Sequence, residues 1–354
     1  MPLSRRRAPK QSSMRTGQLS RSFKGWGLFT HTHFPFGALA GLVVLLASAT
    51  AGQTATSPAY RYRVIAVPLK PWHLSNSGQV AGISKNRAAI WSRRRGLQLL
   101  PALKGFPQSE ARDSNSAGYV VGFATGNDQV SAFAYTSGKM VPLAGKNSKA
   151  LAINDSGEIV GESEVDGNLP VAAVLWKKGQ PASLGGCCGG TAKGINNRGQ
   201  IIGDLYDQTG RYQAFLWASV HGIQHLGPPS GYSSAIAIND AGHVLLQELE
   251  QGVFLYLSPG TTVQIGIPDR QPADCRAINN SDEVVGAFGP FFDADHAFLW
   301  SQKVGFRDLN DLIPANSGWK LQVATGINDR GEIVGFGDHN GEDAAGFLLV
   351  PQKR

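Results

Sequence analysis

The sequence predicts an all-β fold, a seven-bladed β-propeller of four-stranded blades, preceded by an N-terminal targeting segment. A short motif recurs seven times at intervals of about 42 residues, which is the length of one propeller blade. Each copy is followed by two further short apolar segments, and patterns with the period of a helix are absent after the targeting segment. The 44 glycines and 19 prolines suit a chain with many tight turns.

Residues 1–51 have the composition of a targeting segment. They carry seven Lys or Arg side chains and no Asp or Glu, followed by an apolar run from Phe34 to Ala49 and small residues in the A-x-A pattern. The core of the run is about a dozen residues, fewer than the roughly 20 that a spanning helix needs. We therefore expect a cleaved signal peptide and a secreted or periplasmic protein that starts near Thr50 or Gly52. An uncleaved signal anchor, with residues 34–51 in the membrane, is the alternative, and Met1 and Met14 both remain candidate starts.

The net charge of +7 belongs to this segment. The whole chain has 33 Lys and Arg against 26 Asp and Glu, and the first 51 residues contain seven of the basic side chains. The remaining chain is formally neutral, so it lacks the basic surface that displaces counterions from phosphates. We expect no nucleic-acid binding.

The recurring motif is clearest in four places: Ala-Ile-Asn-Asp-Ser-Gly-Glu-Ile-Val-Gly at 152–161 and its relatives at 194–203, 277–286 and 326–335. Weaker copies begin at Ser75, Asn115 and Asn239. A Phe-Leu-Trp-like segment, as at 215–217, and then a short segment ending in leucine complete each repeat. Every repeat thus supplies four short strands.

The first strand of each repeat is expected to be innermost. The second and fourth positions before the motif asparagine are small, as in Ala152 and Ala150, and strict alternation would turn both toward the crowded axis. The apolar residue between them, Leu151 here, would then point to the other face and pack between blades. Asn-Asp-x-Gly is a hairpin turn in which the first Asn or Asp bonds its own backbone and Gly accepts a positive φ. These polar turns are interpreted as structural rather than as binding residues.

The two ends of the repeat array predict how the ring closes. The last repeat ends at Val350 without its leucine strand, whereas residues 62–69 belong to no repeat. The N-terminal strand should therefore complete blade seven and hide the sheet edges of an open ring. Residues 52–354 would form one propeller domain, and we expect a monomer.

These repeats resemble those of the HAF family of extracellular repeat proteins. The segment Asp295-His296-Ala297-Phe298-Leu299-Trp300 contains the tripeptide that names the family, and the segment from Asp308 to Gly335 is similar to its usual final repeat. The resemblance covers about residues 74 to 350. It implies an exported repeat protein and no settled activity. Repeats one and two depart from the pattern in their first strand, and repeat five lacks the final glycine.

The predicted function is that of an exported, non-catalytic binding or scaffold module for a glycan, a peptide or an envelope protein. The catalytic motifs G-x-S-x-G, H-E-x-x-H and G-x-x-x-x-G-K-[ST] do not occur, and no histidine spacing indicates a metal site. The alternative is a hydrolase or lyase of an extracellular polysaccharide, with its site on the variable-loop face. Carboxyl groups of several blades that converge with raised pKa values would favour the enzyme.

The three cysteines leave alternatives open. Cys275 takes a small-residue position on an inner strand, which favours a buried substitute for alanine. Cys187 and Cys188 lie among four glycines in the loop that enters blade four. They would form a vicinal disulfide, or one of them would bridge to Cys275 across the axis, in an oxidising compartment.

Ca²⁺ is an alternative ligand of the Asp-rich turns at 166–168, 207–210, 293–295 and 338–343. None of these turns supplies a full ligand set, and hairpins favour Asp, Asn and Gly in any case. We therefore predict no cofactor.

Strand parity indicates which face carries function. The Asn-Asp-x-Gly turns would occupy one face, and the variable loops within and between blades the other, where binding residues are usually found. Those variable loops are 162–171, 204–213, 287–296 and 336–345 within blades and 185–191, 227–234, 266–274 and 310–322 between them. The candidate ligand-binding residues on that face are Asp166, Asp207, Arg211, Tyr212, Asp293, Asp295, His296 and Trp319.

Overall fold

The computed structural model describes residues 62–352 apart from 166–167, 229–230, 250 and 290–295. The predicted targeting segment and the candidates Asp166, Asp293 and Asp295 lie outside the described residues. Within the described part, no helix is long and apolar enough to cross a membrane.

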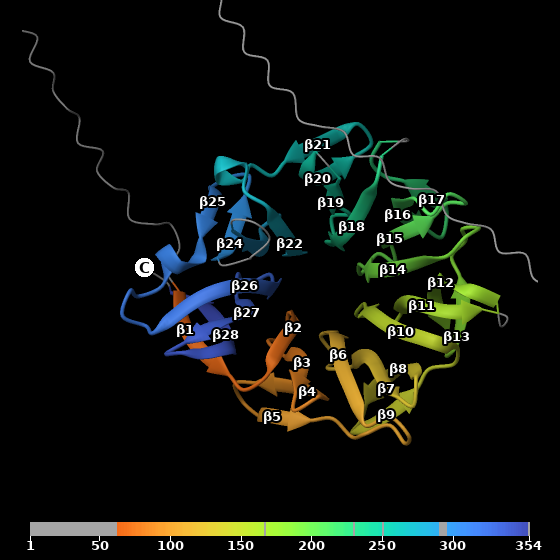
Figure 1. The fold of residues 1–354 in the computed structure, drawn as a ribbon, viewed down its shortest axis with the longest axis horizontal. Helices are drawn as coiled ribbons and strands as arrows, with labels where there is room; N and C mark the ends of the chain where they lie inside the picture. Colours follow the sequence, from red (N-terminus) through yellow and green to blue (C-terminus); the bar gives the residue numbers. More distant parts are fainter. Residues whose placement is uncertain (1–61, 166–167, 229–230, 250, 290–295, 353–354) are drawn as a thin grey trace, which may run out of the picture. The chain divides into compact units, whose positions relative to one another are not determined.

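Seven antiparallel four-stranded sheets surround a central axis, which confirms the predicted seven-bladed propeller (Figure 1). Each blade runs from its innermost to its outermost strand in chain order, except the last. Blades 1 to 3 contain β2 (Lys70–Leu74), β3 (Val80–Ser84), β4 (Arg87–Ser92) and β5 (Gly96–Leu99); β6 (Gln108–Ser114), β7 (Val120–Gly126), β8 (Gln129–Thr136) and β9 (Lys139–Pro142); and β10 (Lys146–Ile153), β11 (Ile159–Val165), β12 (Asn168–Lys177) and β13 (Gln180–Ser183). Blades 4 and 5 contain β14 (Gly190–Ile195), β15 (Ile201–Tyr206), β16 (Tyr212–Ala218) and β17 (Gly222–His225); and β18 (Ser233–Ile238), β19 (Val244–Glu248), β20 (Gly252–Ser258) and β21 (Thr261–Gln264). Blade 6 contains β22 (Ala273–Ile278), β23 (Val284–Phe288), β24 (His296–Ser301) and β25 (Gly305–Asp308).

Blade 7 closes the ring as predicted. Its strands β26 (Trp319–Ile327), β27 (Ile333–His339) and β28 (Glu342–Pro351) are completed by β1 (Tyr62–Val67) from the start of the described chain. Strand β1 pairs with β28 from Tyr62 opposite Pro351 to Val67 opposite Gly346. Each blade therefore has four strands, and the edge of β28 is covered.

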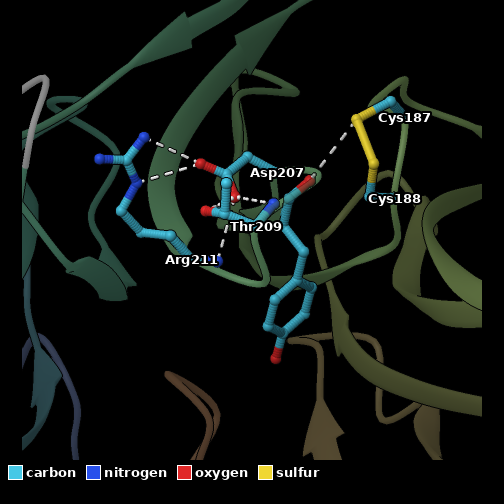
Figure 2. Close-up of a disulfide and its surroundings, with 6 residues drawn as sticks. Cys187, Cys188, Asp207, Thr209 and Arg211 are labelled. Atoms are coloured by element: carbon cyan, nitrogen blue, oxygen red, sulfur yellow. Dashed lines mark hydrogen bonds and ion pairs between the residues drawn. A yellow bond between two sulfur atoms is a disulfide. The ribbon is translucent and has the colours of Figure 1, made fainter.

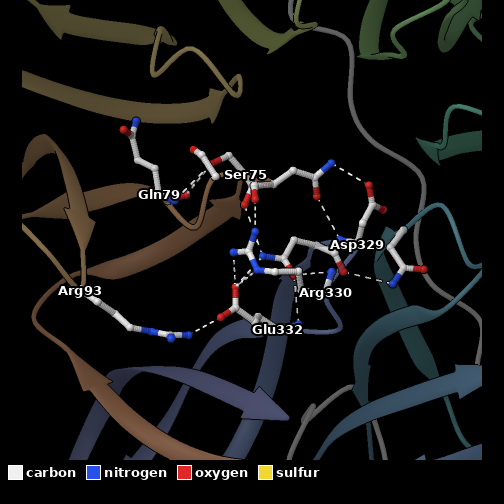
Figure 3. A network of polar contacts seen from close by, with 10 residues as sticks. Ser75, Gln79, Arg93, Asp329, Arg330 and Glu332 are labelled. Carbon is white, nitrogen blue, oxygen red and sulfur yellow. Dashed lines mark hydrogen bonds and ion pairs between the residues drawn. The ribbon is translucent and has the colours of Figure 1, made fainter.

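The seam between blades 7 and 1 also carries a polar network (Figure 3). The Glu332 side chain is only 8% exposed and accepts hydrogen bonds from Arg330, Arg93 and Asn328. Burial raises the pKa of Glu332, but the hydrogen bonds from Asn328 and Arg330 and the charges of Arg330 and Arg93 outweigh it, so the net pKa is lowered. The carboxylate thus joins two blades that are far apart in sequence.

The hydrophobic core lies between neighbouring blades. Aromatic side chains of the third strands, including Phe133, Phe215 and Phe298, are fully buried there. The glycine that ends the motif makes room for this packing: a Cβ on Gly203 would lie 1.9 Å from the carbonyl oxygen of Thr191 and 2.9 Å from Phe215. In blade 4 the first two strands therefore approach too closely at this position for any side chain on residue 203. Blade 5 has Leu246 at the equivalent position and keeps the same strand pairing.

The prediction of strict alternation in the innermost strands was wrong. In all seven blades the register between the first and second strands shifts three residues before the motif asparagine or its blade 1 equivalent, Ser75, and a β-bulge there interrupts the period of two. Blades 3 and 7 have a second shift nearer the start of the strand. Ala150 consequently lies away from the central channel, and Leu151, Ala152 and Ile153 line it. The bulge residues are Trp72, Arg112, Leu151, Lys193, Ile236, Arg276 and Thr325.

Candidate functional site

The two faces of the propeller are built as predicted. The variable loop within a blade lies beside the loop that enters the same blade, because backbone hydrogen bonds join them. The amide of Tyr206 donates to Gly189 O at 3.1 Å, and that of Leu249 donates to Tyr232 O at 3.0 Å. The variable loops therefore share one face, and the Asn-Asp-x-Gly turns occupy the opposite one.

The motif asparagine is an inter-blade clamp. In Asn196, which is 4% exposed, Oδ1 accepts the amide of Gln200 at 2.9 Å inside its own turn, and Nδ2 donates to Asn239 O of the next blade at 2.9 Å. Six blades repeat the link to the next blade; the asparagines are Asn115, Asn154, Asn196, Asn239, Asn279 and Asn328. Blade 1 has Ser75 instead. The structural interpretation of this turn is thus supported by its contacts.

A second polar ring surrounds the mouth of the channel on the same face. The amide of each residue after the motif asparagine donates to the side chain of the equivalent residue in the next blade, as from Asn197 to Asp240 at 2.9 Å. The ring consists of Asn76, Ser116, Asp155, Asn197, Asp240, Asn280 and Asp329, with links at six of the seven seams. Their carboxylates and amides are engaged with one another.

Asp207 and Arg211, two predicted binding residues, are joined to each other. Asp207 Oδ1 accepts hydrogen bonds from the amide and hydroxyl of Thr209, and Oδ2 accepts from Arg211 Nε at 3.0 Å. The hydrogen bond from the Thr209 hydroxyl is the main reason why the pKa of Asp207 falls to about 2. Both side chains therefore shape the β15–β16 turn.

Tyr212, the third predicted residue of this turn, belongs to an aromatic group on the variable face. Its ring lies 6.4 Å from that of Tyr206 and 5.1 Å from that of Tyr232, measured between centroids. Tyr206 is 43% exposed and Tyr232 is 39% exposed. Large exposed rings from two blades thus form a surface against which a flat apolar face can pack. We call Tyr206, Tyr212 and Tyr232 the tyrosine cluster.

A cavity of about 330 Å³ lies beside the tyrosine cluster, between blades 4 and 5. Tyr206, Tyr212 and Leu249 line it together with a polar group. In that group Lys193 Nζ donates to Ser234 Oγ at 2.7 Å and to a carboxylate oxygen of Asp204, and Ser234 donates to the same carboxylate at 3.1 Å. The cavity therefore combines aromatic walls with hydrogen-bonding groups that fix orientation, the usual composition of a small-ligand site.

The loop that enters blade 4 borders this region and contains a vicinal disulfide between Cys187 and Cys188 (Figure 2). Cys187 Sγ lies 4.0 Å from Tyr206 O, next to the turn of Asp207. Cys275 is a free, buried thiol whose pKa is raised, mainly by burial. The alternative bridge to Cys275 does not form, because the two neighbouring cysteines pair with each other.

The other two described candidates lie in different blades and have structural contacts. His296 Nδ1 bonds Asp308, whose side chain also caps the 3₁₀ helix η3 (Leu309–Leu312). Trp319 stacks on His339 with centroids 4.3 Å apart and packs edge-on against Phe347. The structure therefore brings Asp207, Arg211 and Tyr212 together and leaves His296 and Trp319 elsewhere.

Sequence reasoning missed Tyr206, Tyr232, Lys193, Asp204 and Ser234. Tyr206 and Tyr232 lie inside the variable loops, where their aromatic surface was the available signal. Lys193 occupies a bulge position, and its place at the cavity depends on the bulge. Pairing Asp204 with Ser234 requires knowledge of which strands meet across the blade 4–5 seam.

Two observations bear on metal and acid–base chemistry. Within the described ranges, no three His, Cys, Asp or Glu side chains are grouped to hold a metal ion. Burial raises the pKa of Glu248, which lies in sequence between the cavity residues Gln247 and Leu249. Alternation along β19 turns Glu248 away from that cavity. Among the described residues Asp204 is therefore the one carboxyl group that lines it.

Comparison with known proteins extends to the fold. No family model matches the chain, and no curated protein is significantly similar to it. Virginiamycin B lyase from Staphylococcus aureus is 14% identical with a TM-score of 0.53, and the match covers 82% of this chain and 99% of that one. The WD40 propeller domain of Doa1 is 13% identical with a TM-score of 0.54, over 84% and 99% of the two chains. The propeller domain of the Trilobed protease from Pyrococcus furiosus is 9% identical with a TM-score of 0.55, over 83% and 98%. These similarities show that the chain shares the β-propeller fold.

Proposed function

We propose that this protein is an exported binding propeller of the HAF-repeat type, and that its ligand occupies the tyrosine cluster and the adjoining cavity on the variable face. The observation that carries the proposal is the meeting of Tyr206, Tyr212 and Tyr232, from two blades, beside the paired Lys193 and Asp204. Exposed aromatic surface of this extent is uncommon unless it serves an interaction.

The composition of the site favours a glycan or a peptide. Tyrosine rings offer flat apolar faces and hydroxyls, and the ammonium, carboxylate and hydroxyl groups of Lys193, Asp204 and Ser234 can exchange hydrogen bonds with a polar ligand. The seven-bladed scaffold supports this role because loops on a rigid frame hold binding residues in place. Export rests on the composition of residues 1–51, and N-terminal sequencing of secreted material would test it.

The binding site is tested with the mature chain, residues 52–354, on a glycan array and in a pull-down from envelope fractions. The ligand found there is then titrated against Tyr212→Ala and Tyr232→Ala. Each change should weaken binding by tenfold or more, since a buried aromatic anchor contributes about 2 kcal/mol. The matched control is Tyr119→Ala, because Tyr119 is 45% exposed on the opposite face.

Two results would count against this site: equal loss of affinity in Tyr119→Ala, or unchanged affinity in both cluster variants.

Asp207→Ala has a different expected result. Since Asp207 holds its own turn, its loss should weaken binding only together with increased mobility of residues 207–211, measured by hydrogen exchange.

A further inference from the structure

The central channel has a polar sector where blades 1 and 2 meet. Two positions before the motif asparagine, five blades carry Ala or Gly, whereas blades 1 and 2 carry His73 and Asp113. One position before it, five blades carry Ile, and blade 2 carries Ser114. The two repeats that depart from the pattern thus place their unusual side chains next to each other in the channel.

His73 and Asp113 form a fixed pair. His73 Nδ1 lies 2.8 Å from Asp113 Oδ1. Asp113 also accepts the amides of Ser114 at 2.7 Å and of Ile153 at 2.8 Å, so three blades hold its carboxylate. The Ser114 amide also lies 3.3 Å from His73 Nδ1, which is thus engaged by both Asp113 and Ser114. His73 Nε2 has no hydrogen-bond partner among the described residues. A ligand in the channel can therefore use Nε2.

Two buried groups of this sector are unsatisfied. Ser114 is 2% exposed and lines the channel, yet its hydroxyl has no hydrogen-bond partner. The indole Nε1 of Trp72, another channel residue, is buried and equally unpartnered. Buried donors without partners cost stability, so they are rare unless a ligand or solvent completes them.

Arg112 adds a positive charge. Its guanidinium lies 5.3 Å from the ring centre of Trp72 and only 3.5 Å from Glu110, at the limit of a hydrogen bond. Arg276 holds the equivalent bulge position in blade 6 and pairs closely with Asp274. Of these two arginines, Arg112 is the more weakly paired and retains donors for another acceptor.

We propose that Trp72, His73, Arg112, Asp113 and Ser114, the seam cluster, bind a small hydroxylated organic carboxylate in the channel. Arg112 pairs with the carboxylate in the planar geometry that guanidinium favours. The Ser114 hydroxyl and the Trp72 indole are covered in the free protein, so side chains over them shift on binding before the two groups donate to ligand oxygens. His73 Nε2, with Asp113 holding the proton on Nδ1, accepts a ligand hydroxyl. The channel cavity of about 350 Å³ is large enough for a single sugar acid.

A purely structural role explains less of this arrangement. Blade 1 has Ser75 in place of the clamping asparagine, so the His73–Asp113 contact also joins blades that lack a clamp. A role in joining blades 1 and 2 explains why His73 and Asp113 are present. It does not explain why the Ser114 hydroxyl has no partner or why Arg112 is only weakly paired.

The test is isothermal titration of the mature chain with glucuronate, with glucose as the uncharged probe of the same ring. The variants are Arg112→Leu and Ser114→Ile, which restore residues found at these positions in other blades, and Arg276→Leu is the matched control. Glucuronate should bind and glucose should not. Arg112→Leu and Ser114→Ile should weaken glucuronate binding at least tenfold, with less than a threefold effect of Arg276→Leu.

The proposal fails if glucuronate does not bind at 10 mM, on the order of the weakest specific affinities. Equal binding of glucose, or equal losses in Arg112→Leu and Arg276→Leu, would also overturn it. The melting temperature of free Ser114→Ile is measured alongside, so that loss of binding in a variant that stays folded is attributed to the site and not to unfolding. Tyr212→Ala should leave glucuronate affinity unchanged, so that this site and the tyrosine cluster are tested separately.

Discussion

The inter-blade clamp predicts a defined loss of stability when one asparagine is removed. In Asn196→Ala the partly buried amides of Arg198 and Gln200 lose their acceptor, and Asn239 O loses the buried bond that crosses the seam. Each lost neutral hydrogen bond costs about 1 kcal/mol. We expect a decrease of about 3 kcal/mol in the free energy of unfolding.

Urea unfolding followed by fluorescence measures this loss, with Gln208→Ala as the control because Gln208 is exposed in a turn of the same blade. The control should change stability by less than about 0.5 kcal/mol. The slope of unfolding free energy against urea must stay the same, since a change would indicate loss of two-state behaviour. A loss below 1 kcal/mol in Asn196→Ala would refute the clamp.

Three further outcomes follow from the seams and the cysteines. Ser75→Asn should stabilise the protein by about 1 kcal/mol, seen as a higher urea midpoint, because it supplies the clamp that blade 1 lacks. Folding lowers the pKa of Glu332 below its ordinary value of 4.5. The ionised carboxylate therefore stabilises the folded protein above pH 4.5, and this contribution is lost as the pH falls through the pKa of the folded state. In Glu332→Gln the melting temperature should consequently decrease less steeply as the pH is lowered. Native protein should show no thiol reactive toward a disulfide reagent, and mild reduction should expose two, Cys187 and Cys188, while Cys275 reacts only after unfolding.

The blades and the closure could be predicted because they depend on local, repeated signals. Turn residues at each motif and the missing strand after Val350 are visible in the chain itself. The β-bulges could not be predicted, because they arise where seven strands crowd around one axis. A search for strict alternation of side chains along a strand cannot detect a position at which one extra residue is inserted. That is why Leu151 was expected between blades and lies in the channel.

The candidate site was predicted in part. The sequence places Tyr212 on the variable face, and the structure adds that Asp207 and Arg211 pair with each other four residues apart in the same turn. Tyr232 joins the cluster from the next blade, and contacts of that kind depend on how blades pack. The local sequence therefore indicated that binding residues lie on the variable face. Only the fold could show that Tyr206, Tyr212 and Tyr232 lie together there.

The six clamps all run in one direction: each of blades 2 to 6 donates to the blade that follows it, and blade 7 donates back to Ser75 of blade 1. The blades are therefore arranged like the subunits of a cyclic homo-oligomer with head-to-tail interfaces, except that one chain connects them. Each inter-blade interface relates its two blades by a rotation of one seventh of a circle. An extra or missing repeat would change that angle at every seam. Duplication of a blade should therefore produce an open or domain-swapped assembly before it produces a larger ring.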